Sequence, residues 1–299
     1  CSSDLNSYSQ KEYYINSVAD QVYLNPMGEV DLKGLSAEIL YMKDLQEKTG
    51  VKMEVIRHGK YKSAVEPFLA QEMSPENREQ MTVLLNSVWN TIVVDIAKSR
   101  KLSIAQLNAI ANTLGARTPE LALANKLVDK VAYEDEYHDM IKAKLKVDKK
   151  EKYDIVSITD YAKKTASTVE DYSKNDIIAV IYAQGEIAGG EGDVNVIGEG
   201  SIKRSLQEAR EDDDVKAIVL RVNSPGGSAL TSELIWREIE ITKKVKPVVV
   251  SMGNYAASGG YYIAANADRI FAEPNTITGS IGVFGMLPNM NQLGKNIGI

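Results

Sequence analysis

The chain has 299 residues, of which 44% are hydrophobic and 25% charged, and its formal net charge at pH 7 is -6. This composition is typical of globular proteins, and the length suffices for about two domains. The chain has 41 acidic and 35 basic residues, and the basic residues form no continuous stripe. This charge pattern argues against nucleic acid as a partner. A single cysteine, Cys1, excludes an intramolecular disulfide and a cysteine-rich metal site. The apolar runs are strand-sized, well below the roughly 18 to 20 residues of a membrane span.

The first hundred residues are predicted to alternate helices with short strands. Apolar spacing and the placement of Pro and Gly indicate helices at 13–19 and 35–45, strands at 21–24 and 51–56, and a turn at 25–28. A long helix is predicted to begin at Ser74-Pro75-Glu76 and to reach about Arg100, because Ser caps, Pro suits the first helical position and Glu favours the first turn. Thr118-Pro119-Glu120 repeats this start.

Residues 141–174 are the predicted linker between a first domain at 1–140 and a second at 175–299. The linker has many lysines and few large apolar residues. Acidic residues are interleaved with the lysines, so the segment is expected to be a solvated connector rather than a surface for lipid or nucleic acid.

The second half shows strands that alternate with helices, which predicts an α/β fold with a largely parallel sheet. The glycine-rich stretch at 185–200 is expected to be a loop. Strands are expected at 177–182, 215–222, 247–252 and 270–272, and helices at 201–208 and 232–242.

An internal repeat links the two halves. At an offset of 248 residues, Tyr13-Tyr14-Ile15 matches Tyr261-Tyr262-Ile263, and Ala19-Asp20 matches Ala267-Asp268. In this register Ser258 faces Gln10, so a duplicated scaffold has kept a serine in one copy only. Because Cys1 and Ile299 both fall inside the repeat, we expect the natural protein to be longer, with a counterpart of Lys62 beyond the end of this chain.

A glycine pair follows the strand at 217–222, in Asn223-Ser-Pro-Gly-Gly-Ser228, and a helix comes next. Adjacent glycines leave backbone N–H groups exposed to an anion. The loop lacks the Gly-Lys-Ser/Thr of a phosphate loop, which favours an oxyanion hole for a carbonyl that becomes tetrahedral. An ordinary tight strand-to-helix turn is the alternative.

Ser258 lies in Ala256-Ala-Ser-Gly-Gly-Tyr-Tyr262, just past a strand end and at a predicted helical start. Small neighbours leave its hydroxyl open to approach and the N–H of Gly259 free, as a nucleophile requires. The alternative is a small residue that allows close helix packing.

A serine nucleophile needs a base, and the candidates are His58, His138 and Lys62. His138 follows an acidic stretch and is expected at the surface, whereas His58 stands at a strand end where site residues are common. Only about one unperturbed lysine in 2,500 is neutral at pH 7, so Lys62 would need burial to lower its pKa by several units, a change of about 4 to 5 kcal/mol.

Four stretches carry a resemblance when taken together and in this order. They are Arg221-Val-Asn-Ser-Pro-Gly-Gly-Ser228, Met252-Gly-Asn-Tyr-Ala-Ala-Ser-Gly-Gly-Tyr261, Thr278-Gly-Ser-Ile-Gly-Val-Phe-Gly285 and Tyr61-Lys-Ser-Ala-Val-Glu-Pro-Phe68. They resemble the signal peptide peptidase A (protease IV) family, serine-lysine peptidases within the ClpP/crotonase group of folds. The long, double-domain form of that family is the better match, so the resemblance implies two tandem ClpP/crotonase-like repeats, each incomplete in this chain.

The resemblance implies a role for each matched residue. Ser258 would be the nucleophile and Lys62 the general base, with Ser280 hydrogen-bonded to the lysine amine. Gly226 and the N–H of Gly259 would form the oxyanion hole. Base and nucleophile would then come from different halves of the duplicated chain.

The resemblance also implies the setting of the enzyme. Substrates would be cleaved signal peptides and other unfolded apolar peptides, and neither a cofactor nor a metal would be needed. The family pattern implies a homotetramer in the bacterial inner membrane that faces the periplasm, held by an anchor outside this chain. Two alternatives stay open: a crotonase-like acyl-CoA enzyme that uses the same loop for a thioester enolate, and a non-catalytic peptide-binding scaffold.

Overall fold

The computed structural model describes residues 2–166 and 176–299, and the chain divides into two compact units. One unit comprises Cys1–Ala37 and Leu84–Glu170, and the other comprises Glu38–Val83 and Asp171–Ile299. The segment around Lys62 therefore belongs to the same compact unit as Ser258. The expected domains at 1–140 and 175–299 are parts of a duplicated sequence, whereas the two compact units are defined by packing. The expected domain bounds stay a prediction.

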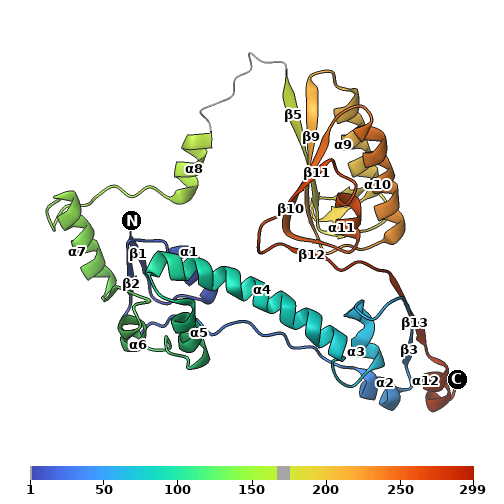
Figure 1. Cartoon of the computed structure of the whole chain (residues 1–299), viewed down its shortest axis with the longest axis horizontal. Helices are drawn as coiled ribbons and strands as arrows, with labels where there is room; N and C mark the ends of the chain where they lie inside the picture. The colour runs from blue at the N-terminus through green and yellow to red at the C-terminus, as the bar shows by residue number, and fades with distance from the viewer. Residues whose placement is uncertain (1, 167–175) are drawn as a thin grey trace. The chain divides into compact units, whose positions relative to one another are not determined.

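A parallel sheet forms the centre of the second unit (Figure 1). Its strands are β5 (Ile177–Gln184), β9 (Val215–Ser224), β10 (Val248–Ala257) and β11 (Arg269–Phe271), in the order β11-β10-β9-β5, with the short β12 (Ile277–Gly279) paired to the end of β10. The predicted α/β class with a largely parallel sheet is confirmed. Each expected strand in this half is present, although β10 ends five residues later than predicted, at Ala257.

Two helices cover one face of this sheet, α9 (Glu199–Glu211) and α10 (Ala229–Lys243) (Figure 1). Leu206 of α9 and Ile235 of α10 are buried in one cluster with strand residues such as Ile218 and Val250. Burial of these side chains removes apolar surface from water and fixes both helices against the sheet. The carboxyl ends of β9 and β10 meet at one edge, where the glycine pair and Ser258 follow.

The loop predicted at 185–200 is only partly a loop. It contains a small three-stranded sheet of β6 (Glu186–Ile187), β8 (Val196–Ile197) and β7 (Gly192–Asp193), and α9 begins at Glu199. The expectation rested on the glycines, but Ile187 and Ile197 are buried in the core of the unit. Burial of these two side chains orders the segment despite its glycine content.

The second unit also holds an antiparallel pair, β3 (Lys52–Arg57) with β13 (Phe284–Asn289). The strand predicted at 51–56 is thus confirmed within one residue. The short helices α2 (Lys43–Thr49) and α12 (Asn291–Ile297) adjoin these strands, and the N–H of Leu293 donates to the carbonyl of Gly50. This pairing joins the segment that carries Lys62 to the segment that follows Ser280.

The helix predicted at 35–45 is wrong for most of its length, because α2 begins only at Lys43. Residues 35–42 have no regular structure, and Leu40 is 74% exposed. A short helix depends on a surface that receives its apolar face. The segment has no such surface, and its counterpart at the 248-residue offset lies in the strand β13 rather than in a helix.

The first unit is built on a parallel sheet of β1 (Ser2–Leu5), β2 (Gln21–Leu24) and β4 (Lys130–Val131). Its helices are α1 (Gln10–Asn16), the later part of α4 (Pro75–Arg100), α5 (Ile104–Asn112), α6 (Pro119–Ala124), α7 (Glu134–Leu145) and α8 (Ile158–Ala166). Tyr13, Leu24, Ile96 and Leu127 belong to one buried cluster. Helices α7 and α8 occupy part of the expected linker, whose last residues lie outside the described part.

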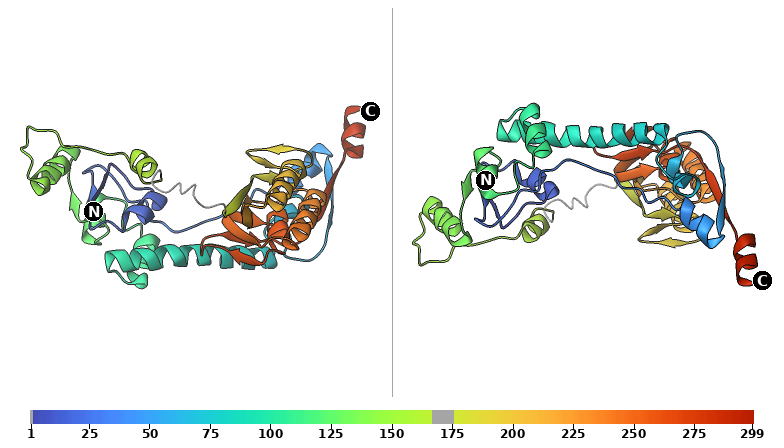
Figure 2. Two further views of the ribbon diagram at one scale, coloured as in Figure 1. Left: turned by 90° about the horizontal axis from the view of Figure 1, so that it is seen from above. Right: turned by 90° about the horizontal axis from the view of Figure 1, so that it is seen from below.

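Both predicted helix starts are confirmed. Ser74 Oγ accepts the N–H of Asn77, and Thr118 Oγ1 accepts the N–H of Leu121, so each side chain satisfies one backbone donor of the first turn. Helix α4 continues without a break to Arg100, as both views in Figure 2 show. The boundary between the two compact units falls inside this helix, after Val83.

The repeat is visible in the backbone. Helix α2 falls on α12, and the parallel bridge between Tyr8 and Val30 falls on the pairing of Ala256 with Thr278, all at the offset of 248. Two segments of one chain share elements and pairings, so the duplication inferred from sequence is confirmed.

Candidate active site

Ser258 is the single residue between β10 and α11 (Gly259–Ala264). Its backbone has φ 53° and ψ -119°, and its N–H donates to the carbonyl of Gly279 at 2.8 Å. At a residue other than glycine this pair of angles lies outside the small left-handed region that is allowed. Such strain costs of the order of 1 to 3 kcal/mol and clusters at active sites. The helical start expected at Ala256 is wrong, because the strand continues through Ala257 and the strained turn falls on the serine.

The Ser258 hydroxyl does not cap its own helix, although serine is a favoured N-cap residue. Ser228, at the N-cap of α10, shows the ordinary behaviour: its Oγ accepts the N–H of Thr231. The twisted backbone at Ser258 instead directs Oγ toward Lys62, whose Nζ lies 3.1 Å away.

Lys62 stands just before the short helices η1 (Ser63–Val65) and α3 (Glu66–Leu69). Its amine donates to the Ser280 carbonyl at 2.5 Å and lies 3.1 Å from Ser280 Oγ. One amine thus contacts Ser258 and Ser280, 196 and 218 residues further along the chain. The structure therefore brings together the three residues that the resemblance named.

The amine of Lys62 is withdrawn from solvent, because the residue is only 7% exposed. Its aliphatic stem packs against Gly282, where a Cβ would lie 3.6 Å from Lys62 Cδ. Burial penalises the ammonium form and lowers the pKa of Lys62 below its ordinary value. A lysine with a lowered pKa and a serine hydroxyl within hydrogen-bond distance can exchange a proton.

The glycine loop lies directly against the serine. Gly226 has φ +103°, and a Cβ there would lie 2.7 Å from both Ser258 Cβ and Gly259 N. Its own N–H donates to Ser224 Oγ at 3.1 Å, so that donor is already engaged. Gly226 thus leaves the space beside Ser258 open, and it is not the better hydrogen-bond donor of the pair.

Gly227 is a candidate donor that the sequence interpretation did not single out. Among the described residues, neither the Gly227 N–H nor the Gly259 N–H has an acceptor. The two groups are close together, because a Cβ on Gly259 would lie 3.3 Å from Gly227 N. Two free N–H groups beside a serine Oγ can bind an oxyanion. The sequence offered two adjacent glycines and no means of choosing between them.

Gly226→Ala is expected to lower kcat by about 100-fold, since the methyl group would fill the space beside Ser258 where charge develops in the reaction. Gly190→Ala is the matched control, because Gly190 has φ +105° and no atom within 4 Å of its Cβ position. Both variants place alanine at nearly the same positive φ, which costs of the order of 1 to 3 kcal/mol. Steady-state kinetics and thermal unfolding measure the two effects, and equal activity of the two variants would contradict the steric argument.

In the first copy of the repeat, Gln10 stands where the second copy has Ser258, and its side chain is hydrogen-bonded to nearby backbone. Gln10 Oε1 accepts the N–H groups of Lys33 and Gly34, and Nε2 donates to the Gly34 carbonyl. The counterparts of Lys33 and Gly34 at the offset of 248 are Ile281 and Gly282, beside Lys62. The side chain that replaced the serine therefore bonds to backbone that stays open in the second copy.

The model of peptidase family S49 matches residues 4–148 and 240–299. The chain belongs to peptidase family S49. Its S49 relatives include "Protease 4" of Haemophilus influenzae, 39% identical over 98% of this chain, and "Protease 4" of Salmonella typhi, 40% identical over 98%. "Serine protease SPPA, chloroplastic" of Arabidopsis thaliana is 34% identical over 96%.

The chain spans about half the length of the curated relatives it matches, with 49%, 48% and 43% of their lengths covered. The expected resemblance to the protease IV family is thus confirmed.

The two histidines of this S49 chain lie elsewhere than the serine. His58 is exposed, and no hydrogen bond among the described residues joins it to Ser258. His138 lies in the first unit, where its ring is hydrogen-bonded to Tyr153 and stands 3.5 Å from Glu134. Of the three candidate bases, Lys62 is the one beside the serine.

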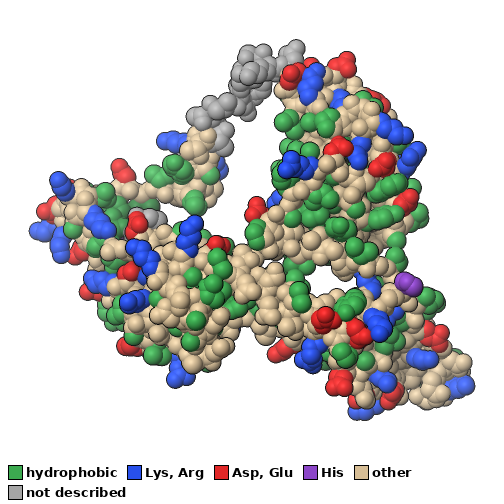
Figure 3. Space-filling view, in the orientation of Figure 1, with side chains coloured by type: hydrophobic (Ala, Val, Ile, Leu, Met, Phe, Trp, Pro, Cys, Tyr) green, Lys and Arg blue, Asp and Glu red, His purple; other side chains and the backbone are tan. Residues whose placement is uncertain are grey.

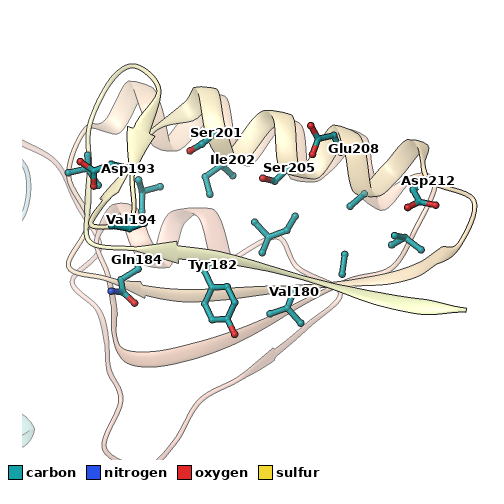
Figure 4. A pocket seen from close by; sticks show the side chains of 16 residues that line it. Val180, Tyr182, Gln184, Asp193, Val194, Ser201, Ile202, Ser205, Glu208 and Asp212 are labelled. Carbon is teal, nitrogen blue, oxygen red and sulfur yellow. The ribbon is translucent and has the colours of Figure 1, made fainter. Parts of the chain in front are cut away.

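A cavity of about 770 Å³ lies elsewhere in the second unit, between β5 and α9 (Figure 4). Its lining includes Val180, Tyr182, Ile202 and Glu208, but neither Lys62 nor Ser258.

Basic and acidic side chains are interspersed over the face drawn in Figure 3. Within residues 2–166 and 176–299, no helix has the length and apolarity needed to cross a bilayer.

Proposed function

We propose that the intact protein is a serine endopeptidase with Ser258 as nucleophile and Lys62 as general base. The observation that carries this proposal is the 3.1 Å separation between Lys62 Nζ and Ser258 Oγ, with the amine buried. Neutral Lys62 accepts the Ser258 proton as Oγ attacks a peptide carbonyl. Membership of family S49 supports the same chemistry.

The tetrahedral intermediate carries a negative oxygen, which the N–H groups of Gly227 and Gly259 would stabilise. Protonated Lys62 then gives its proton to the leaving amine, and the C–N bond breaks to leave an ester on Ser258. Lys62 removes a proton from a water molecule as the water oxygen attacks the ester carbonyl. The C–O bond to Ser258 then breaks, the proton on Lys62 passes to Ser258 Oγ, and the acyl part of the peptide leaves as a carboxylic acid. Ser280, through its carbonyl and Oγ, holds the amine of Lys62 in reach of both steps.

Unfolded apolar peptides, cleaved signal peptides among them, are the proposed substrates. The support is an open strip of chain after Ser280, where Ile281 is 77% and Val283 is 65% exposed. Leu230, shortly after the glycine loop, is also exposed. An extended peptide could add its backbone to such a strip and place apolar side chains on these residues. Membrane anchoring, a periplasmic location and assembly into a homotetramer belong to the same proposal for the intact protein.

The test offers the intact protein three compounds: an unfolded apolar peptide, a stably folded protein of the same size and an acyl-CoA thioester. We expect internal cleavage of the peptide, identified by product masses, and cleavage of the folded protein at least about 100-fold slower because its bonds are not presented as extended chain. Turnover of the thioester without peptide cleavage would contradict the peptidase and favour the crotonase-like reaction.

A further inference from the structure

Glu66 is a buried carboxylate outside the proposed proton-transfer steps. It lies four residues after Lys62, begins α3, and is only 3% exposed. Asn77 Nδ2 donates to it at 2.6 Å, the Ser74 N–H at 3.3 Å and the Tyr41 hydroxyl at 3.4 Å. These three donors are neutral, and no cation pairs with Glu66 within the described parts of the second unit. Burying a charge without a counter-charge is costly, so the carboxylate calls for an explanation.

The carboxylate fastens one end of the segment that presents Lys62. At the other end, Arg57 Nη1 donates to the Lys62 carbonyl at 3.2 Å. Between them, Gln80 Nε2 donates to Ser63 Oγ at 2.6 Å. Asn77 and Gln80 both lie near the start of α4, so the first turns of this long helix are hydrogen-bonded to the segment 62–66. The bonds to Glu66 tie the turn 62–66 to that helix.

The hydrogen bonds of Glu66 keep its carboxylate ionised. Burial, the largest influence, raises the pKa of Glu66, but its hydrogen bonds together outweigh burial and leave the pKa lowered. The neighbouring charges act on other groups of this region. A backbone hydrogen bond and Lys60, which pairs with Glu76, lower the pKa of Glu76, and the charge of Glu66 opposes that effect. The charge of Arg78 opposes the rise that burial causes in the pKa of Tyr41. Burial alone lowers the pKa of Lys62.

We propose that Glu66 is a positioning residue: its hydrogen bonds to Asn77, Ser74 and Tyr41 hold the turn that keeps Lys62 Nζ buried against Ser258 and Ser280. The inference rests on the proposed function of Lys62 as general base. Loosening the turn admits water to the amine, which restores the ammonium form and moves the reacting atoms apart.

The test is Glu66→Gln in the intact protein, with kcat followed against pH on the unfolded peptide. Gln keeps the shape but places an amide donor toward other donors. We expect kcat at pH 7 to fall roughly 10- to 100-fold with little change in KM. We also expect the pH at which activity rises to move upward by about 0.5 to 1 unit, because a better solvated Lys62 has a higher pKa. Simple removal of a negative charge would move it downward.

The matched control is Glu238→Gln, since Glu238 is also a buried acid but pairs with Arg210 between α10 and α9. It is expected to lower the unfolding temperature and leave the pH profile in place. Asn77→Ala, which deletes the 2.6 Å bond and keeps the carboxylate, is the second variant and should move the profile in the same direction even if Glu66→Gln does not fold.

An unmoved or downward-shifted profile in the folded variants overturns the inference, as does an equal upward shift in Glu238→Gln. Lys62→Met in the same assay separates the two proposals. If Lys62→Met is inactive and the Glu66 profile is unmoved, only the role of Glu66 fails. If Lys62→Met keeps its activity, the general base is wrong and the role of Glu66 fails with it.

Discussion

Ser258→Ala is expected to lower kcat on an unfolded peptide by about 10,000-fold or more, because the variant lacks the oxygen on which the proposed ester forms. The substrate contacts would remain, so binding of the peptide should change little. The unfolding temperature should hold or rise, since alanine removes a polar group from a strained turn without leaving a large cavity. Steady-state kinetics, peptide binding and thermal unfolding measure the three effects.

Ser205→Ala is the matched control, a serine of α9 in the same unit and outside the described contacts of Lys62. It should keep full activity. Residual turnover of Ser258→Ala within about tenfold of the wild type would remove the serine from the mechanism and favour a scaffold that only binds peptides.

Lys62→Met is expected to lower kcat by at least about 1,000-fold and to abolish the rise of activity with pH. In the wild type that rise follows deprotonation of Lys62, and its midpoint should lie below pH 10.5, the ordinary pKa of lysine, because burial lowers the pKa of Lys62 in the folded state. Methionine keeps the apolar packing on Gly282 and cannot accept a proton. The pH profile of kcat is the measurement.

The same variant has a second expected effect, on stability. In the pH range between the lowered pKa of folded Lys62 and 10.5, the unfolded chain binds more protons than the folded one, so stability rises with pH there. Below that range the wild type carries the full cost of a buried ammonium. Lys62→Met should therefore be the more stable protein at pH 7, with an advantage that shrinks as the pH approaches 10.5.

Two substitutions serve as controls for Lys62→Met. Lys60→Met changes an exposed lysine that pairs with Glu76 and should leave both the rate and the pH profile in place. His58→Ala should do the same. Loss of activity in His58→Ala with retention in Lys62→Met would transfer the role of base to the histidine.

The local elements with strong chemical markers could be predicted from the sequence. The starts of α4 and α6 carry Ser or Thr followed by Pro, and both begin where predicted. The parallel strands β5, β9 and β10 each contain an apolar run, at 177–183, 217–220 and 248–250, and short apolar runs bounded by turn signals predict strands. Segments whose structure depends on distant partners could not be predicted in this way, and β13 exists only because β3 pairs with it.

The candidate site also combines features that have a local sequence marker with features that depend on distant residues. Small residues around Ser258 marked it as a candidate nucleophile, but its positive φ arises from the junction of β10 with α11 and has no sequence marker. Nothing local distinguishes Lys62 from the other lysines, since its burial depends on Gly282 and Ser280. Gly227 is the proposed donor in place of Gly226 because the Gly226 N–H is hydrogen-bonded to Ser224, a contact that only the folded loop shows.

The pairing of Lys62 with Ser258 is the central claim, and labelling by a serine-acylating probe tests it most directly. The intact wild type and Lys62→Met are treated with the probe over a range of pH, and the adduct is located by mass spectrometry. The account predicts one adduct, on Ser258, that forms faster as the pH rises, and a rate at least about 100-fold lower without that pH dependence in Lys62→Met. An adduct on another residue, or equal rates in the two proteins, would contradict it.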